Sequence, residues 1–174
     1  MRKIPVLQGE HAVVADPGVT LTTVLGSCIA VCLVDPAVRI GGMNHFLLGE
    51  PGRGAGVIDD LQRYGVHAME VLINAMMARG AERQHLRAHL YGGANILRGL
   101  GAIGSLNADF ARRFLRTEGI AIVHEDVGGA VARRVEFLPV EGRSRCSHVA
   151  RAPRQQPSTM ALQSGRAGEL ELFG

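Results

Sequence analysis

The sequence predicts one α/β domain in which strands and helices surround a single core. Runs of β-branched and apolar residues alternate with two segments whose apolar residues recur at helical spacing. A chain of 174 residues is long enough for one well-buried core and short for two. No internal repeat is visible. We therefore expect an α/β sandwich that folds as one unit.

The expected strands are short apolar runs bounded by turn residues. The first, Val19–Leu25, is rich in β-branched residues and is followed by Gly26. Asp35, Pro36 and Ala37 supply turn chemistry, so the apolar runs on either side of them form a hairpin. Because both faces of its first strand are apolar, this hairpin is expected to be buried on both sides. The further segments expected as strands are 28–34, 39–48, 86–91, 120–124 and 130–138.

Two segments have the apolar stripe of an amphipathic helix. The first covers 66–79 and ends at Gly80, and the second covers about 106–117 and ends at Gly119. Between them, the glycine-rich segment 92–95 is interpreted as a turn, because it matches no phosphate-binding or dinucleotide-binding pattern.

The composition of the chain changes after Glu141. Residues 142–168 contain many Arg, Ser, Gln, Pro and Gly residues and few large apolar ones, which predicts a loosely ordered tail. Residues 169–173 alternate polar and apolar side chains, which favours a terminal edge strand. The expected organisation is a folded domain at 1–141 and a tail at 142–174.

Charge and cysteine content narrow the class of protein. The net charge is +3, and the basic residues are scattered rather than gathered in a stripe with aromatic neighbours. This pattern argues against a nucleic-acid-binding protein. No apolar run approaches the ~20 residues that cross a bilayer, and no secretory signal is visible, so a cytoplasmic protein without membrane insertion is expected. Three cysteines, two of them four residues apart, favour reduced thiols over a disulfide framework.

The hairpin brings a thiol and an imidazole together. With Pro36 and Ala37 at the centre of the turn, Cys28 lies directly opposite His45. Facing side chains on one face of a sheet have Cβ atoms ~5 Å apart. A nearby imidazolium favours the thiolate, which is the nucleophilic form of cysteine. The pair Cys28 and His45 is therefore a candidate nucleophile and base.

The residues before Cys28 suit a nucleophile. Gly26 permits a sharp turn, and the backbone N–H groups at Ser27 and Cys28 are candidate donors to a substrate oxyanion. Thr22 and Thr23 on the preceding strand both offer a hydroxyl that would orient the imidazole.

Two other interpretations of these residues stay open. A cysteine or histidine in a strand is more often a core residue than a catalytic one, and Cys32 in particular is expected to be one. Cys28, Cys32 and His45 together also form a candidate metal-ligand set, although the spacing C-x-x-x-C differs from the common C-x-x-C.

The hairpin resembles a known family. The segments LGSCIAVC at 25–32, DP at 35–36 and GGMNHF at 41–46 resemble the active-site hairpin of CheD chemoreceptor glutamine deamidases. The resemblance extends over about residues 3–140. Its further matches are Tyr64 with the helix after it, Gly92-Gly93-Ala94, Ile103-Gly104 with Asn107, and Asp126 to Gly129 followed by Arg133.

The resemblance implies a fold and a catalytic group. The implied fold is a single-domain three-layer α/β sandwich with a mixed sheet, resembling the catalytic domain of cytotoxic necrotizing factor toxins. The family's Cys–His–Thr triad maps onto Cys28, His45 and Thr22, whereas Thr23 departs from that mapping. Gly26 and Ser27 are the implied oxyanion and substrate-binding positions. No cofactor or metal is implied.

The resemblance also implies a reaction and partners. Family members hydrolyse glutamine side chains of chemotaxis receptors to glutamate through a thioester, and some also hydrolyse glutamyl methyl esters. The cytoplasmic helices of chemoreceptors are the implied substrate, and a CheC-type phosphatase is a candidate partner. A non-catalytic chemotaxis adaptor and a different thiol amidohydrolase or peptidase remain the alternatives.

Overall fold

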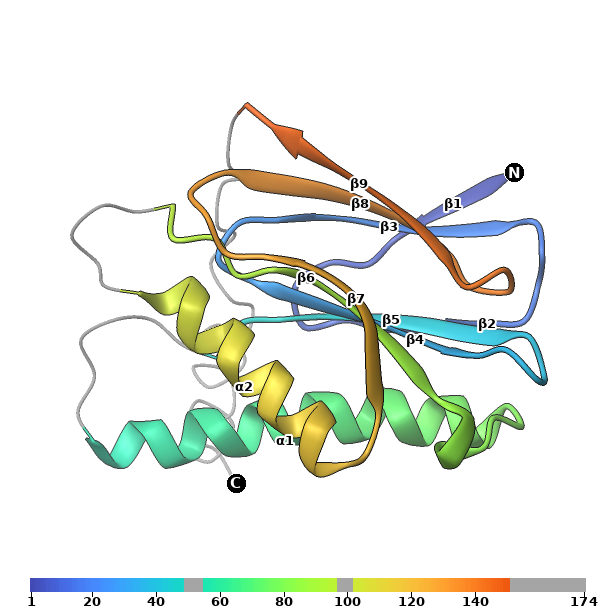
Figure 1. Ribbon diagram of the computed structural model, residues 1–174, viewed down its shortest axis with the longest axis horizontal. Coiled ribbons are helices and arrows are strands. Elements are labelled where there is room, and N and C mark those ends of the chain that lie inside the picture. Colours follow the sequence, from blue (N-terminus) through green and yellow to red (C-terminus); the bar gives the residue numbers. More distant parts are fainter. Residues whose placement is uncertain (49–54, 97–101, 151–174) are drawn as a thin grey trace, which may run out of the picture.

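The computed structural model describes residues 1–48, 55–96 and 102–150. Within these residues nine strands form two mixed sheets, and two long helices cover one face of the second sheet (Figure 1). The molecule thus has three layers, in the order sheet, sheet, helices. The three-layer α/β sandwich expected from the sequence is confirmed, with two mixed sheets where one was expected.

The first sheet, called sheet A, contains strands from both ends of the described chain. Its β1 runs parallel to β3, and its other neighbouring strands are antiparallel. In spatial order its strands are β1 (Arg2–Pro5), β3 (Val19–Leu25), β8 (Ala132–Leu138) and β9 (Arg143–Val149).

The second sheet, called sheet B, lies in the middle of the molecule. Among its pairs of neighbouring strands, β6 and β7 are parallel and the other pairs are antiparallel. In spatial order its strands are β2 (His11–Val14), β5 (Ile40–Phe46), β4 (Ile29–Asp35), β6 (Arg87–Gly92) and β7 (Ala121–Val127). Every residue of β4 and β5 is buried, so the hairpin is covered on both faces as expected.

The helices α1 (Ala55–Ala78) and α2 (Ile103–Thr117) pack on the outer face of sheet B, and a short 3₁₀ helix (Arg83–His85) precedes β6. Alternation along β4 divides its side chains between two cores. Val31 and Leu33 pack with the helices, whereas Ala30, Cys32 and Val34 face sheet A. The core between the two sheets therefore contains one face of the hairpin.

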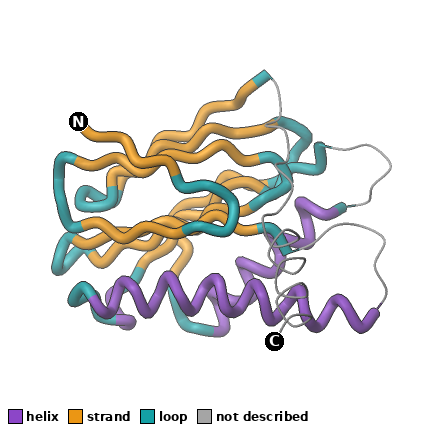
Figure 2. Tube along the Cα trace, turned by 180° about the vertical axis from the view of Figure 1, so that it is seen from behind, coloured by secondary structure: helices purple, strands orange, loops and turns teal. Residues whose placement is uncertain are grey.

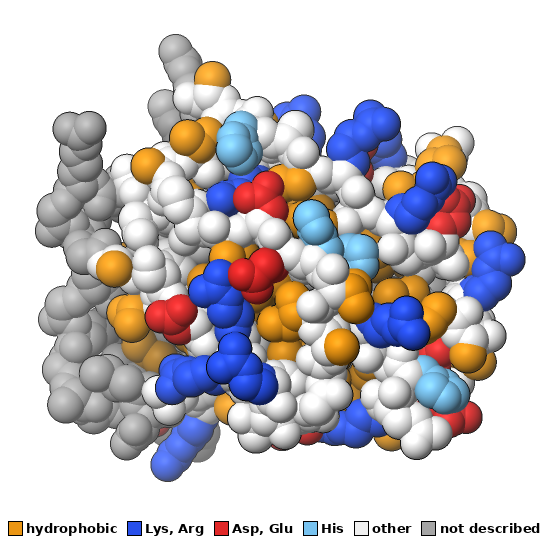
Figure 3. Space-filling model, viewed as in Figure 1, with side chains coloured by type: hydrophobic (Ala, Val, Ile, Leu, Met, Phe, Trp, Pro, Cys, Tyr) orange, Lys and Arg blue, Asp and Glu red, His pale blue; other side chains and the backbone are white. Residues whose placement is uncertain are grey.

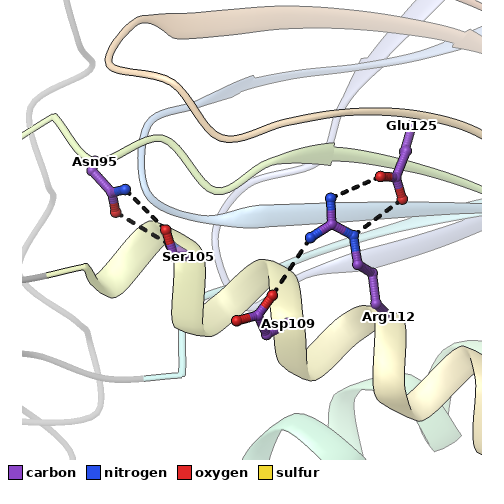
Figure 4. Close-up of polar contacts among 5 residues, drawn as sticks. All are labelled: Asn95, Ser105, Asp109, Arg112 and Glu125. Carbon is purple, nitrogen blue, oxygen red and sulfur yellow. Dashed lines mark hydrogen bonds and ion pairs between the residues drawn. The ribbon is translucent and has the colours of Figure 1, made fainter.

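Helix α2 is tied to the sheet by polar contacts at two places (Figure 4). Near its start, Asn95 accepts a hydrogen bond from the backbone N–H of Ser105 at 3.2 Å and donates to its hydroxyl at 3.0 Å. Further along, Arg112 donates to both carboxylate oxygens of Glu125 on β7, at 2.7 and 3.2 Å. These contacts hold the helix that carries Asn107 against β7 and against the segment that follows β6.

The expected elements agree with the structure within a few residues, apart from three strands and the start of α1, which lies at Ala55. Helix α1 begins before the predicted 66, and α2 begins three residues before the predicted 106. Strands β1 and β2 were not expected, because each has four residues and little apolar patterning. A tail loosely ordered from residue 142 is wrong for Arg143–Val149, which form β9 along β8. The expected strand at 169–173 lies outside the described residues.

Charged side chains are dispersed over the face of the molecule drawn in Figure 3. On the face shown in Figure 3, acidic side chains lie beside several of the basic ones, and no continuous basic stripe crosses that face. No helix in the described part of the chain is long and apolar enough to span a membrane.

Candidate active site

The hairpin β4–β5 sets the relation between Cys28 and His45. His45 pairs with Ala30, so Cys28 is its diagonal neighbour and does not lie directly opposite. The predicted register is wrong by two positions because the turn has four residues, 36–39, between the paired Asp35 and Ile40. Arg39 adopts a φ of 58° in this turn and donates its N–H to the carbonyl of Asp35 at 2.9 Å.

A shift of two positions preserves the face of every side chain, because successive strand residues alternate between faces. Cys28 accordingly packs with Ala30 and Cys32 in the core between the sheets, and His45 is on the same face of sheet B. Diagonal neighbours on one face are ~7–8 Å apart at Cα, with Cβ atoms closer, which long side chains can span. The structure therefore places the predicted thiol and imidazole as diagonal neighbours on one face of sheet B, and the recorded hydrogen bonds of each side chain go to other groups.

Two groups outside the hairpin hold the imidazole of His45. Its Nδ1 lies 2.9 Å from Oγ1 of Thr23 and 3.1 Å from the carbonyl oxygen of Val6. The Thr23 hydroxyl donates its own proton to the same carbonyl, at 2.8 Å. A carbonyl oxygen only accepts, so Nδ1 must carry the ring proton and donate it to both oxygens. In the neutral ring, Nε2 is then the nitrogen with the free lone pair.

The threonine that contacts His45 is Thr23, and the predicted contact with Thr22 is wrong. Leu21 and Leu25 point from β3 into the core between the sheets, and alternation gives Thr23 the same direction. Thr22 points to the other face of sheet A, and only its backbone takes part, by accepting a hydrogen bond from the N–H of Val6 at 2.8 Å. The two leucines flanking the threonines were a usable sequence signal for this choice.

The turn at Gly26–Ser27–Cys28 is anchored through its carbonyl oxygens. The carbonyls of Gly26 and Cys28 accept hydrogen bonds from the N–H groups of Ala94 and Gly93, at 3.0 and 2.8 Å. The side-chain amide of Asn107 on α2 donates to the carbonyl of Ser27 at 2.8 Å. Its Oδ1 accepts from the N–H of Leu48 at 3.1 Å.

The glycine-rich segment at the end of β6 comes very close to this turn. Gly92 has a φ of +107°, and a Cβ there would overlap the carbonyl oxygen of Cys28. Gly93 has a φ of +64° and lies against the backbone of Gly104 on α2. The segment thus has the left-handed glycines that turn geometry requires, and the N–H of Gly93 holds the carbonyl of Cys28.

Burial determines the charge state of the pair. Cys28 is 8% exposed and His45 is 7% exposed. Burial raises the pKa of the Cys28 thiol to about 12, opposed by the N–H of Cys28 itself. Burial lowers the pKa of His45, opposed by its hydrogen bond to Val6 and by the carboxylate of Glu10. Burial thus favours a neutral thiol and a neutral imidazole at rest, whereas the sequence pattern favoured a thiolate next to an imidazolium.

Comparison with known proteins places this chain in a family. The family model for CheD chemotactic sensory transduction matches residues 48–148. A relative from Zymomonas mobilis, named probable chemoreceptor glutamine deamidase CheD, is 52% identical over 173 residues, covering 99% of this chain and 93% of that protein. A relative with the same name from Caulobacter vibrioides is 51% identical over 176 residues, covering 98% and 93%.

The chain belongs to the CheD family. Among solved structures, a Neisseria meningitidis protein of the DUF152 family has a TM-score of 0.48 and 15% identity, covering 75% of this chain and 65% of that one.

In this CheD chain the candidate metal set is not assembled. Cys32 is fully buried in the core between the sheets, as a core residue is expected to be. No group of three or more His, Cys, Asp or Glu side chains arranged to hold a metal occurs in residues 1–48, 55–96 and 102–150.

The CheD site also contains two side chains that the sequence did not single out for chemistry. Gln8 lies in the connection that crosses from β1 in sheet A to β2 in sheet B (Figure 2), and its Oε1 accepts a hydrogen bond from the Cys28 thiol at 3.7 Å. Tyr64 on α1 lies near Cys28. Burial is the main cause that raises the pKa of Tyr64, and the nearby Cys28 thiol is the second. No periodicity marks Gln8, because its loop reaches the thiol only in the folded chain.

Proposed function

We propose that this chain hydrolyses glutamine side-chain amides of chemoreceptors to glutamate and ammonia, with Cys28 as nucleophile and His45 as base. The observation that carries the proposal is the hydrogen bonding at His45. Thr23 and Val6 hold the proton on Nδ1, which leaves Nε2 to take a proton from the thiol on the same face. The names of the relatives, all probable chemoreceptor glutamine deamidases, supply the substrate.

The neutral resting pair requires base-assisted attack. As Sγ of Cys28 bonds to the glutamine Cδ, Nε2 of His45 takes the thiol proton, so no free thiolate accumulates. The imidazolium then protonates the leaving nitrogen, the C–N bond breaks and ammonia departs, leaving a thioester. His45 next takes a proton from water, whose oxygen attacks the thioester carbon and releases glutamate and the restored thiol.

The backbone N–H groups at Ser27 and Cys28 are the proposed donors to the tetrahedral oxyanion. The carbonyls of this turn are held by Ala94, Gly93 and Asn107, which fixes the orientation of its peptide groups. Among the described residues, none accepts a hydrogen bond from the N–H of Ser27. Donors fixed in this way need no reorganisation as charge develops.

Other features implied by the family resemblance remain part of this proposal. They are a cytoplasmic location, hydrolysis of glutamyl methyl esters, a CheC-type phosphatase as partner and a fold like that of the cytotoxic necrotizing factor catalytic domain. A mass measurement separates the proposed activity from the two alternatives. Incubation with a receptor cytoplasmic fragment should raise its intact mass by about 1 Da per converted amide. A non-catalytic adaptor would leave the mass unchanged, and a peptidase would produce fragments.

Replacement of the nucleophile tests the mechanism. Cys28→Ala should abolish ammonia release, a loss of at least ~10³-fold, while the circular dichroism spectrum stays that of the folded chain. Cys32→Ala is the matched control, because Cys32 lies on the same strand face with no role in the reaction. It should lower thermal stability and keep most of the activity. Near wild-type turnover by folded Cys28→Ala would rule out the mechanism.

A further inference from the structure

The carboxamide of Gln8 lies where the substrate's own carboxamide must enter. Its Oε1 is 3.7 Å from Sγ of Cys28 and accepts the thiol proton. The oxygen, not the Cδ carbon, faces the sulfur, so Gln8 is not placed for attack by Cys28. Gln8 is itself exposed, whereas the thiol beneath it is buried. Gln8 therefore lies at the solvent-facing entrance of the proposed site.

The loop that carries Gln8 is held to the catalytic hairpin on both sides. The N–H of Gly9 donates to the carbonyl of His45 at 2.8 Å, and the N–H of His45 donates to the carbonyl of Glu10 at 3.1 Å. Within the loop, the N–H of Glu10 donates to the carbonyl of Leu7 at 2.9 Å, and Gly9 has a φ of +87°. The carbonyl of Val6, just before the loop, is an acceptor for Nδ1 of His45. Gln8 is therefore positioned by the same backbone that orients the base.

We infer that Gln8 is a specificity residue, whose Oε1 accepts a hydrogen bond from the NH₂ group of the substrate glutamine and thereby favours amides over esters. This inference rests on the proposed deamidase function. For attack, the substrate Cδ must come within ~3–3.5 Å of Sγ, and its nitrogen is bonded to that carbon. Both the nitrogen and Oε1 of Gln8 then lie close to Sγ, within hydrogen-bonding reach of each other. A methyl ester and the glutamate product carry no N–H to donate.

The same contact links substrate entry to activation of the thiol. A thiol has one proton, and in the structure it is donated to Gln8. When Oε1 of Gln8 turns to the substrate NH₂, that proton is released to Nε2 of His45. A bound amide thereby replaces the thiol as the hydrogen-bond partner of Gln8.

Gln8→Leu removes the acceptor at similar size, and its effect is measured on two substrates of the full-length chain. One is a receptor cytoplasmic fragment with glutamine at the modified positions, and the other carries glutamyl methyl esters there. The variant should lower kcat/KM for the amide roughly tenfold more than for the ester, since one neutral hydrogen bond is lost. Leu7→Ala, a change at the exposed neighbour, should leave the amide-to-ester ratio unchanged. Equal losses on both substrates, no loss, or a gain on both would overturn the inference.

A second readout is independent of the receptor. The full-length chain is labelled with iodoacetamide or with methyl iodoacetate, and peptide mapping compares the two rates at Cys28 with those at Cys146 in the same molecule. Gln8→Leu should lower the amide-to-ester labelling ratio at Cys28 relative to Cys146, and an unchanged ratio would overturn the inference. If wild-type chain released no ammonia from the receptor but the labelling ratio fell as expected, the proposed function would fail and the amide recognition would stand.

Discussion

His45 depends on groups that come from two other segments of the chain. Thr23 lies on β3 of sheet A, and Val6 follows β1, so both reach across the interface between the sheets. Their arrangement matters because a hydroxyl that donates to Val6 can only accept from Nδ1. The chemistry of the proposed site therefore depends on two protons. The hydroxyl proton of Thr23 is donated to Val6, and the ring proton of His45 is held on Nδ1.

Removal of the Thr23 hydroxyl tests this orientation. Thr23→Val should lower kcat roughly fivefold, since Nδ1 keeps only its bond to Val6 and one hydrogen bond is worth about 1 kcal/mol. Thr23→Ser should restore most of the rate because it retains the hydroxyl. Thr22→Val is the matched control on the opposite face and should keep near wild-type kcat. A larger loss for Thr22→Val than for Thr23→Val would contradict the assignment.

The carboxylate of Glu10 should set the acid limit of activity. It raises the pKa of His45 against the dominant lowering by burial. Glu10→Gln keeps an acceptor for the N–H of Leu7 but removes the charge, so the pKa of His45 falls further. The base then stays neutral to lower pH, and the acid limb of the kcat/KM profile should move to lower pH. The difference from wild type should shrink at high salt, because exposed charges are screened. A limb that moves to higher pH would contradict the electrostatic argument.

At the scale of elements, the site is built where three segments meet at the end of the β4–β5 hairpin. The turn before β4 carries Cys28, the segment after β6 holds its carbonyl groups, and α2 adds the amide of Asn107. The hairpin supplies the face, but contacts from these neighbouring elements decide where Cys28, the proposed nucleophile, lies on it.

Gly92 is the position at which this contact is tightest. Gly92→Ala should cost the ~1–2 kcal/mol of a left-handed residue plus the displacement of the Cys28 carbonyl that a Cβ would overlap. Gly119→Ala isolates the backbone cost, because its φ is +71° and its Cβ would meet no described atom within 4 Å. Denaturant unfolding and ammonia release should show a larger stability loss and a much larger activity loss for Gly92→Ala. Equal behaviour of the two variants would mean that the close approach does not position Cys28.

The whole molecule buries two histidines whose protonation opposes folding. Burial is the main cause that lowers the pKa of both His45 and His89, and for His89 the neighbouring His124 adds to it. An unfolded histidine takes up its proton near pH 6.5. Between that pH and the lowered pKa values, the unfolded chain therefore binds more protons than the folded one, and stability increases with pH in that window.

We expect the free energy of unfolding to fall as the pH is lowered from 7.5 to 5.5. Urea unfolding at the two pH values measures the change. His89→Asn keeps a donor near the hydroxyl of Ser144, which lies 2.9 Å from Nδ1 of His89, but cannot titrate. This variant should show a smaller decrease than wild type. A free energy of unfolding that rises toward pH 5.5 would contradict the sign of this prediction.

The sequence by itself determined the elements of the core and the face shared by Cys28 and His45. Periodicity is a property of neighbouring residues, so β3, β4, β5, α2 and the end of α1 were predicted close to their observed bounds. The prediction that Cys28 and His45 share a face is correct although the predicted register is wrong. The register error is two residues, and side chains alternate between faces with a period of two.

Only the tertiary structure decided which groups meet at that face. Thr23 rather than Thr22 reaches His45 because β3 belongs to the other sheet, and its inward face is set by packing against sheet B. Gln8 reaches the thiol because its loop crosses between the sheets, and β9 is a strand because β8 offers it a partner edge. These contacts join residues far apart in the chain, and local patterning carries no information about which distant surfaces pack together.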